Sequence, residues 1–111
     1  MAPKNKHERV LNKLLYSDES LRKIGIEGKI WAAKEVPWWK NGRLYCEIDL
    51  LVFTGSLYVR PFHVIEYKSN MVDEEYFLTQ LMRGEEFVQH NFGQKCYKYF
   101  VYKDLEHKMI G

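Results

Sequence analysis

Residues 46–53 have the sequence CEIDLLVF, and residues 63–70 have the sequence HVIEYKSN. Both stretches are apolar enough for buried β-strands, yet Asp49 lies inside the first and Glu66 inside the second. A carboxylate in such a strand costs free energy unless it is paired or bound to a metal. The apolar residues around Asp49 fall on both strand faces, which predicts a sheet covered on both sides.

Strand periodicity predicts how these polar side chains are arranged. Side chains alternate between the two faces of a strand, so Glu66 and Lys68 share a face while Tyr67 and His63 point to the other. A packed or edge histidine, rather than a general base, is therefore expected at His63. If the two strands are neighbours, Asp49 can meet Glu66 across the sheet. Two carboxylates beside a lysine suit Mg²⁺ or Mn²⁺ and indicate phosphodiester hydrolysis.

The surrounding segments predict an α/β domain that spans residues 1–111. The order is helix, strand, strand, strand, helix, strand, with a central mixed sheet of about four strands and helices on its faces. Asn41-Gly42 predicts the turn of a hairpin, and Pro37 is expected at a bulge, a strand end or an exposed edge. The expected elements are a helix at 5–16, a helical turn at 21–26, strands at 29–38, 43–53 and 62–68, a helix at 73–90 and a strand at 96–102.

Composition constrains the possible partners and the compartment. The formal net charge of +2 favours no partner class, so nucleic-acid binding needs a local basic surface. Cys46 and Cys96 lack the paired spacing of a zinc site or a disulfide framework. No apolar run has transmembrane length and the start does not resemble a signal peptide, so a cytoplasmic protein without a membrane partner is expected. The candidate basic clusters are Lys4, Lys6, Arg9 and Lys13, then Arg22, Lys23 and Lys29, then Lys40 and Arg43.

The acidic strands also resemble a known signature. Ile48-Asp49, a gap of seventeen positions and Glu66-Tyr67-Lys68 resemble the motif of the PD-(D/E)XK nuclease superfamily, although Ile48 replaces its proline. The order of elements resembles the restriction-endonuclease-like core of that superfamily. The resemblance implies that Asp49 and Glu66 bind Mg²⁺ or Mn²⁺ and that the backbone carbonyl of Tyr67 completes the metal site. It also implies that Lys68 is the catalytic lysine.

Three further positions bear on the resemblance. It implies that Glu8, on the first helix, lies near the metal, and that Gln80, on the second long helix, points into the site. Each of these two residues can equally be a solvated helix residue. Gly84 stands where one subgroup of the superfamily carries a tyrosine, so assignment to that subgroup is not supported.

The function implied by the resemblance is an Mg²⁺-dependent endonuclease that acts on DNA as a homodimer, with four-way Holliday-junction DNA as one candidate substrate. Two alternatives stay open: a catalytically inactive DNA-binding module that acts with a partner, and an unrelated interaction domain in which the three charged residues form a structural ion pair. Trp38, Trp39 and Tyr45 can stack on bases, but packing across the hairpin is the favoured interpretation.

Overall fold

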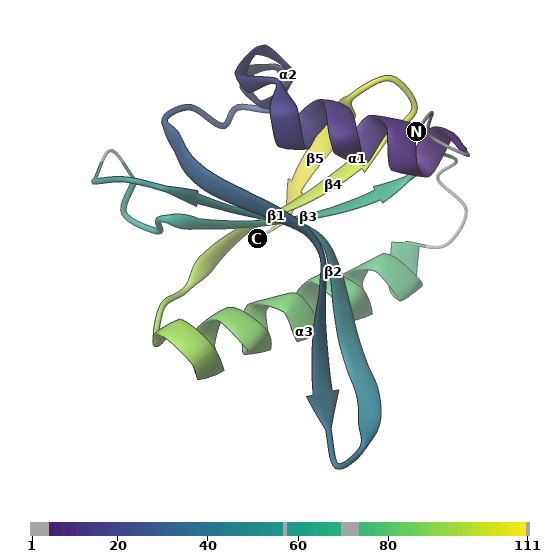
Figure 1. The fold of residues 1–111 in the computed structure, drawn as a ribbon, viewed down its shortest axis with the longest axis vertical. Coiled ribbons are helices and arrows are strands. Elements are labelled where there is room, and N and C mark those ends of the chain that lie inside the picture. Colours follow the sequence, from purple (N-terminus) through teal and green to yellow (C-terminus); the bar gives the residue numbers. More distant parts are fainter. Residues whose placement is uncertain (1–4, 57, 70–73, 111) are drawn as a thin grey trace.

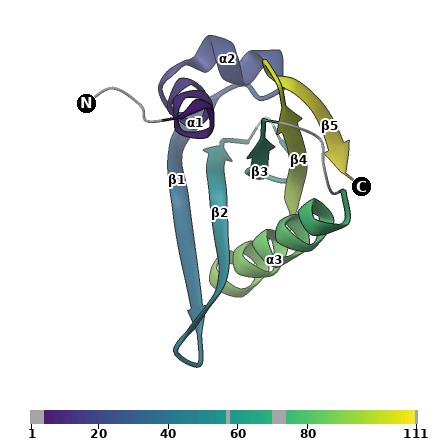
Figure 2. The same cartoon turned by 90° about the vertical axis from the view of Figure 1, so that its right-hand side faces the viewer.

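The computed structural model describes residues 5–56, 58–69 and 74–110. A twisted sheet lies between two helical layers, with α1 and α2 on one face and α3 on the other (Figures 1 and 2). The strand order is β1-β2-β3-β4-β5, and only the β3–β4 pair is parallel. The elements are α1 (Lys6–Tyr16), α2 (Asp18–Lys23), β1 (Lys29–Lys40), β2 (Arg43–Thr54), β3 (Phe62–Lys68), α3 (Glu74–Phe92), β4 (Cys96–Tyr102) and β5 (Glu106–Ile110).

The α/β class is confirmed, but the expected strand number is wrong because the described sheet has five strands. The additional strand, β5, pairs antiparallel with β4 after a turn in which Lys103 and Leu105 have positive φ angles of 50° and 65°. Four of its five side chains are exposed. The strand therefore lacks the apolar alternation by which a half-buried strand is recognised in a sequence.

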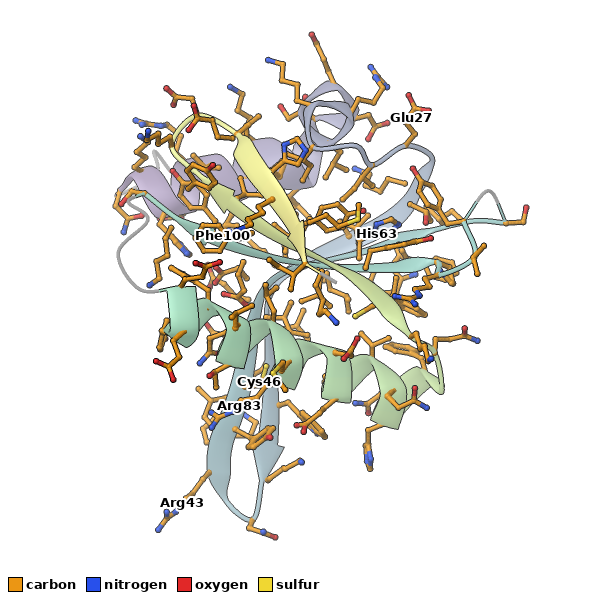
Figure 3. All side chains as sticks on the ribbon, turned by 180° about the vertical axis from the view of Figure 1, so that it is seen from behind. Glu27, Arg43, Cys46, His63, Arg83 and Phe100 are labelled. Carbon is orange, nitrogen blue, oxygen red and sulfur yellow. The ribbon has the colours of Figure 1, made fainter. Side chains whose placement is uncertain are left out.

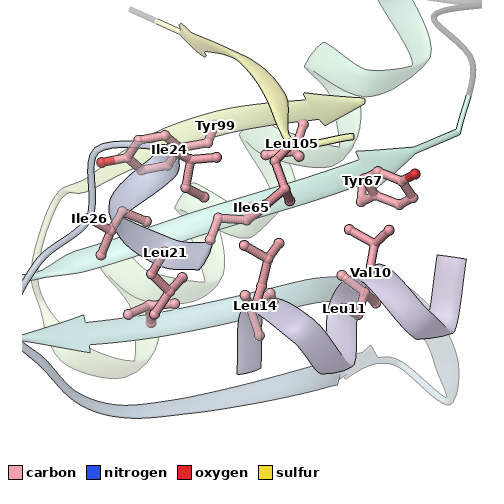
Figure 4. Packing of buried hydrophobic residues seen from close by; sticks show 13 residues of the cluster. Val10, Leu11, Leu14, Leu21, Ile24, Ile26, Ile65, Tyr67, Tyr99 and Leu105 are labelled. Atoms are coloured by element: carbon pink, nitrogen blue, oxygen red, sulfur yellow. The ribbon is translucent and has the colours of Figure 1, made fainter. Parts of the chain in front are cut away.

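The first helix forms as expected and covers one face of the sheet. Asn5 caps it, because its side-chain oxygen accepts a hydrogen bond from the Glu8 N–H at 2.8 Å. The buried side chains of α1, including Leu11 and Leu14, pack in the same cluster as Ile65 of β3 (Figure 4). Burial of this apolar stripe orients α1 across β1, β2 and β3.

The short second helix begins earlier than the expected range of 21–26. Ser17 caps α2, since its hydroxyl oxygen accepts a hydrogen bond from the Ser20 N–H at 3.2 Å. Helical structure therefore starts at Asp18 and ends at Lys23. Ile26, which was expected inside the helical turn, is buried beyond its end.

Helix α3 lies on the opposite face of the sheet. Of the expected helix at 73–90, Asp73 falls outside the described residues, and the helix ends at Phe92 before Gly93, whose φ is +64°. At Gly84 the helix rests directly on β3, because an added Cβ would lie 2.7 Å from Val64 Cγ1. Among the described residues, no helix is long and apolar enough to cross a membrane. Cys46 and Cys96, both buried on this side of the sheet, are free thiols.

The β1–β2 hairpin forms as the sequence predicts. Asn41 and Gly42 make its turn with φ angles of 51° and 75°. Pro37 is exposed on β1, which is an edge strand, in agreement with the expected position at an exposed edge. Trp38 packs edge-on against Tyr45 with ring centroids 5.4 Å apart, which agrees with the prediction that these aromatic residues pack across the hairpin.

The hairpin also bends, which strand periodicity did not predict. Ile48 packs on the α3 side of the sheet whereas Leu50 packs beneath α1, although both have even numbers. The face therefore changes at Asp49. Glu35, which the register places opposite Asp49, has a positive φ of 54°. Beyond this bend the outer half of the hairpin extends past α3 (Figure 1).

Candidate active site

The two acids meet at the point where β2 and β3 separate. Leu50 and Ile65 form the last pair of the β2–β3 ladder. Beyond it, the Tyr67 N–H donates to Asp49 Oδ2 at 2.9 Å, and the Asp49 N–H faces Glu66 Oε1 at 3.4 Å. Each carboxylate thus accepts a main-chain N–H of the other strand. The side chains replace the missing ladder bonds and hold each other in place.

Both acids are buried, with exposed fractions of 9% for Asp49 and 5% for Glu66. Burial, together with the neighbouring Asp49 carboxylate, raises the pKa of Glu66 from its ordinary value of 4.5 to about 10. At neutral pH the pair therefore holds one proton, because two buried carboxylates this close repel each other when both are ionised.

The acids open into a cavity of about 390 Å³ between β2, the end of β3 and α3. Lys68 and Gln80 line this cavity with them, so four of the expected site residues come together. Lys68 Nζ also lies 5.6 Å above the ring centre of Tyr76. The full lining is His7, Leu44, Tyr45, Cys46, Glu47, Asp49, Glu66, Lys68, Tyr76, Gln80 and Arg83.

His7 lines the cavity from α1, in the place where Glu8 was expected to contribute. His7 Nε2 lies 3.3 Å from Asp49 Oδ2, and this hydrogen bond raises the pKa of His7 against the opposing effect of burial. Glu8 is half-buried and is not part of the cavity lining. The helical repeat explains the difference. His7 is three residues before Val10 and four before Leu11, so it lies on the same buried face of α1 as these two residues, whereas Glu8 lies beside that face. Extending the apolar stripe backwards by one turn could have found His7.

Tyr67 contributes its main chain to the site, whereas its ring packs beside that of His7 with ring centroids 5.7 Å apart. Its side chain points to the α1 side, as strand periodicity predicts, and its hydroxyl donates to the Lys103 carbonyl at 3.0 Å. The main chain of Tyr67 lies between the acids, with its N–H already bonded to Asp49.

His63 is a packed histidine, as expected, and lies within the sheet (Figure 3). Thr54 Oγ1 donates its one hydrogen to the Pro61 carbonyl and therefore accepts from His63 Nε2–H at 3.0 Å. The opposite nitrogen, Nδ1, then accepts from the Tyr99 hydroxyl at 2.8 Å. Because burial lowers the pKa of His63 to about 4, the ring is neutral and is satisfied by its neighbours.

The donor set of the cavity fits a hard divalent cation. Two carboxylates face the same space, and burial together with the Asp49 carboxylate raises the pKa of Glu66, so a bound cation would relieve the repulsion between the two acids. Within the described ranges, no group of three or more His, Cys, Asp or Glu side chains forms a closed ligand set. A main-chain oxygen and waters would have to complete the coordination, as is usual for Mg²⁺.

A larger hollow of about 650 Å³ lies beside the second half of α3, and its lining includes Glu85 and Glu86 of α3 together with Lys95 and Lys98. We assign the site to the smaller cavity because it contains the two buried acids. Comparison with known protein families and with curated proteins finds no match to the chain. Function is therefore inferred from the geometry of the site.

Proposed function

We propose that the chain is a metal-dependent nuclease that hydrolyses phosphodiester bonds in DNA. The observation that carries this proposal is the meeting of Asp49 and Glu66 at the separation of two strands, in a cavity that also contains Lys68. A structural ion pair does not require two carboxylates so close that one of them must hold a proton. Two such acids beside a cation are suited to a metal ion and a phosphate group.

Each residue then has a distinct role. Asp49 and Glu66 hold the cation, with the carbonyl of Tyr67 as a third oxygen donor. A bound Mg²⁺ supplies positive charge for the phosphate and lowers the pKa of a water molecule. The Lys68 ammonium neutralises charge that develops on the phosphate oxygens, and Gln80 offers an amide to position the water or the substrate.

His7 is a positioning residue in this scheme. Its imidazole holds Asp49 Oδ2, the same oxygen that accepts the Tyr67 N–H. The hydrogen bond to Asp49 raises the pKa of His7, which favours a protonated imidazole beside the acids when no cation is bound. Cation binding should therefore compete with the proton of His7 as well as with that of Glu66.

We also propose that the chain acts as a homodimer on branched DNA, with two sites facing two strands. A domain of 111 residues offers little surface for gripping a duplex, and a second copy would double it. Light scattering of the protein alone and with a four-way junction tests the dimer. A monomer under both conditions would refute it.

The test of the nuclease uses labelled four-way junction, flap, single-stranded and duplex DNA in Mg²⁺, Mn²⁺ or EDTA. Cleavage is expected only with metal and is expected to be lost in Asp49→Asn, Glu66→Gln and Lys68→Gln. The matched control is Glu19→Gln, which removes an exposed carboxylate of α2 on the other side of the sheet. Its cleavage rate should equal that of the wild type.

Metal binding is measured separately by thermal unfolding. Mg²⁺ or Mn²⁺ should raise the melting temperature of the wild type and of Glu19→Gln, but not that of Asp49→Asn. An equal rise in Asp49→Asn would refute the metal site. Metal binding and DNA binding without cleavage of any substrate would refute the nuclease and favour the inactive DNA-binding module.

A further inference from the structure

A second hollow continues the active-site cavity towards the end of the hairpin. Its volume is about 510 Å³, and it shares the lining residues Leu44, Tyr45 and Arg83 with the cavity that contains the acids. Its other lining residues, Lys40, Asn41 and Arg43, belong to the end of the hairpin. No carboxylate is among these six described lining residues, whereas three of the six side chains are cations.

The ring of Tyr45 contacts two of these cations, Lys40 and Arg83. Lys40 Nζ lies 4.1 Å and Arg83 Cζ 4.6 Å from the centre of the Tyr45 ring, so the two charges are at most about 9 Å apart. The Arg83 guanidinium also donates to the Tyr45 carbonyl at 3.0 Å, and the Tyr45 hydroxyl donates to Glu86 at 2.5 Å. The ring and the guanidinium are thereby fixed in position.

Charges separated by less than the Debye length, about 10 Å at moderate salt, repel each other appreciably. Cation–π contacts with Tyr45 offset part of this repulsion. Arg43 adds a third charge at the outer end of the hairpin, while Arg83 lies beside the hairpin on α3 (Figure 3). An anion with several charges along its length would match this arrangement better than a single small ion.

We propose that this basic hollow binds the phosphodiester backbone of the nucleic-acid strand where it leaves the active site. The identity of the ligand rests on the proposed nuclease function, whereas the charges and the continuity with the cavity are properties of the structure. Arg83 holds the phosphates nearest the acids. Lys40 and Arg43 hold those farther along the strand, so the hairpin acts as an arm that lengthens the contact with the substrate.

The test measures the affinity for a labelled single-stranded oligonucleotide in EDTA at several salt concentrations. The double variant Lys40→Gln/Arg43→Gln is compared with Lys13→Gln/Arg22→Gln, which removes the same charge from exposed positions of α1 and α2. Loss of two phosphate contacts should reduce the slope of log affinity against log salt by about 1.5. The control variant should keep the slope of the wild type. Equal slopes for the two double variants would overturn the proposal.

A second substrate separates this proposal from the nuclease activity. Bis(p-nitrophenyl) phosphate is too short to reach from the acids to the hairpin, so Lys40→Gln/Arg43→Gln should hydrolyse it at the wild-type rate. An equal loss of activity on this ester and on DNA would overturn the assignment of the hollow to the departing strand. If the wild type hydrolyses neither substrate, the nuclease is refuted, and the salt dependence of binding still decides whether the hollow binds the strand.

Discussion

Replacement of Glu66 by glutamine should make the metal-free protein less sensitive to rising pH. Glutamine has nearly the shape of a protonated glutamic acid but cannot ionise. In the wild type, the folded chain keeps a proton on the Glu66–Asp49 pair that the unfolded chain releases near pH 4.5. Unfolding therefore releases a proton, and higher pH favours the unfolded state.

The expected magnitude follows from proton linkage. Between pH 4.5 and about 10 the folded Glu66–Asp49 pair binds one proton more than the same residues in the unfolded chain, so its contribution to the free energy of unfolding falls by about 1.4 kcal/mol per pH unit. Between about pH 7 and pH 9 the fall should reach about 3 kcal/mol. This window lies above the titration of His63, whose folded and unfolded pKa values are about 4 and 6.5. Glu66→Gln should lack this contribution.

Urea unfolding in EDTA at three pH values in this window measures the effect. Glu19→Gln serves as the control and should show the pH dependence of the wild type, since its carboxylate is exposed on α2. Saturating Mg²⁺ should reduce the dependence in the wild type, because a bound cation replaces the shared proton. Equal pH dependence in the wild type and Glu66→Gln would refute the idea that the two acids share a buried proton.

Three further outcomes are expected. Lys68→Gln should keep the rise in melting temperature with Mg²⁺ but cleave DNA at least about 100-fold more slowly; loss of the metal response would show that the lysine supports the site rather than the reaction. Gly84→Ala should destabilise the fold by about 1–2 kcal/mol in urea unfolding. The added Cβ would lie 2.7 Å from Val64 Cγ1, and this overpacking outweighs the gain in helix propensity. Thr79→Ala on the exposed face of α3 is the control, and an equal loss of stability in that variant would contradict the close contact. Burial lowers the pKa of His63 to about 4, so below pH 6.5 the unfolded chain binds a proton at this residue that the folded chain does not. The contribution of His63 to stability should therefore fall by up to about 3 kcal/mol as the pH drops towards 4, which offsets the gain from the Glu66–Asp49 pair over the same range. In urea unfolding, His63→Gln should lack this offset and gain stability relative to the wild type as the pH drops; equal slopes in the two proteins would refute this origin.

The parts of the fold with strong local signals were predictable from the sequence. The third strand and the fourth lie where the sequence places them, at 62–68 and 96–102, because each is a short run of apolar and β-branched or aromatic residues next to a turn. Asn41-Gly42 likewise determined the hairpin. The positions of Asp49 and Glu66 inside apolar strands predicted that the two acids can meet if their strands are neighbours, and the β2–β3 pairing fulfils this condition.

The rest depended on tertiary structure. At Asp49 the side chains of β2 switch from the α3 side of the sheet to the α1 side, because the hairpin bends there. The alternation of residues within one strand does not predict such a switch. Strand β5 is stabilised by pairing with β4 rather than by its own apolar side chains. No role was assigned to His7 from the sequence, because a histidine without metal-ligand spacing does not indicate a site. Its position one turn before Val10 and Leu11 nevertheless predicts that it lies on the buried face of α1. Glu8 was named from the family resemblance, which gives no information about its direction on α1.

The two edges of the sheet restrict how a second copy of the chain could associate with it. On β1, Pro37 lacks an N–H and Glu35 distorts the backbone, so the outer edge offers no long, regular row of hydrogen-bonding groups. On β5, the edge strand has only five residues and exposes four of its side chains, including the charged Glu106 and Lys108. Growth into a continuous intermolecular sheet is thereby discouraged at both ends. A dimer of this chain is therefore expected to form through its helices or loops rather than by extension of the sheet.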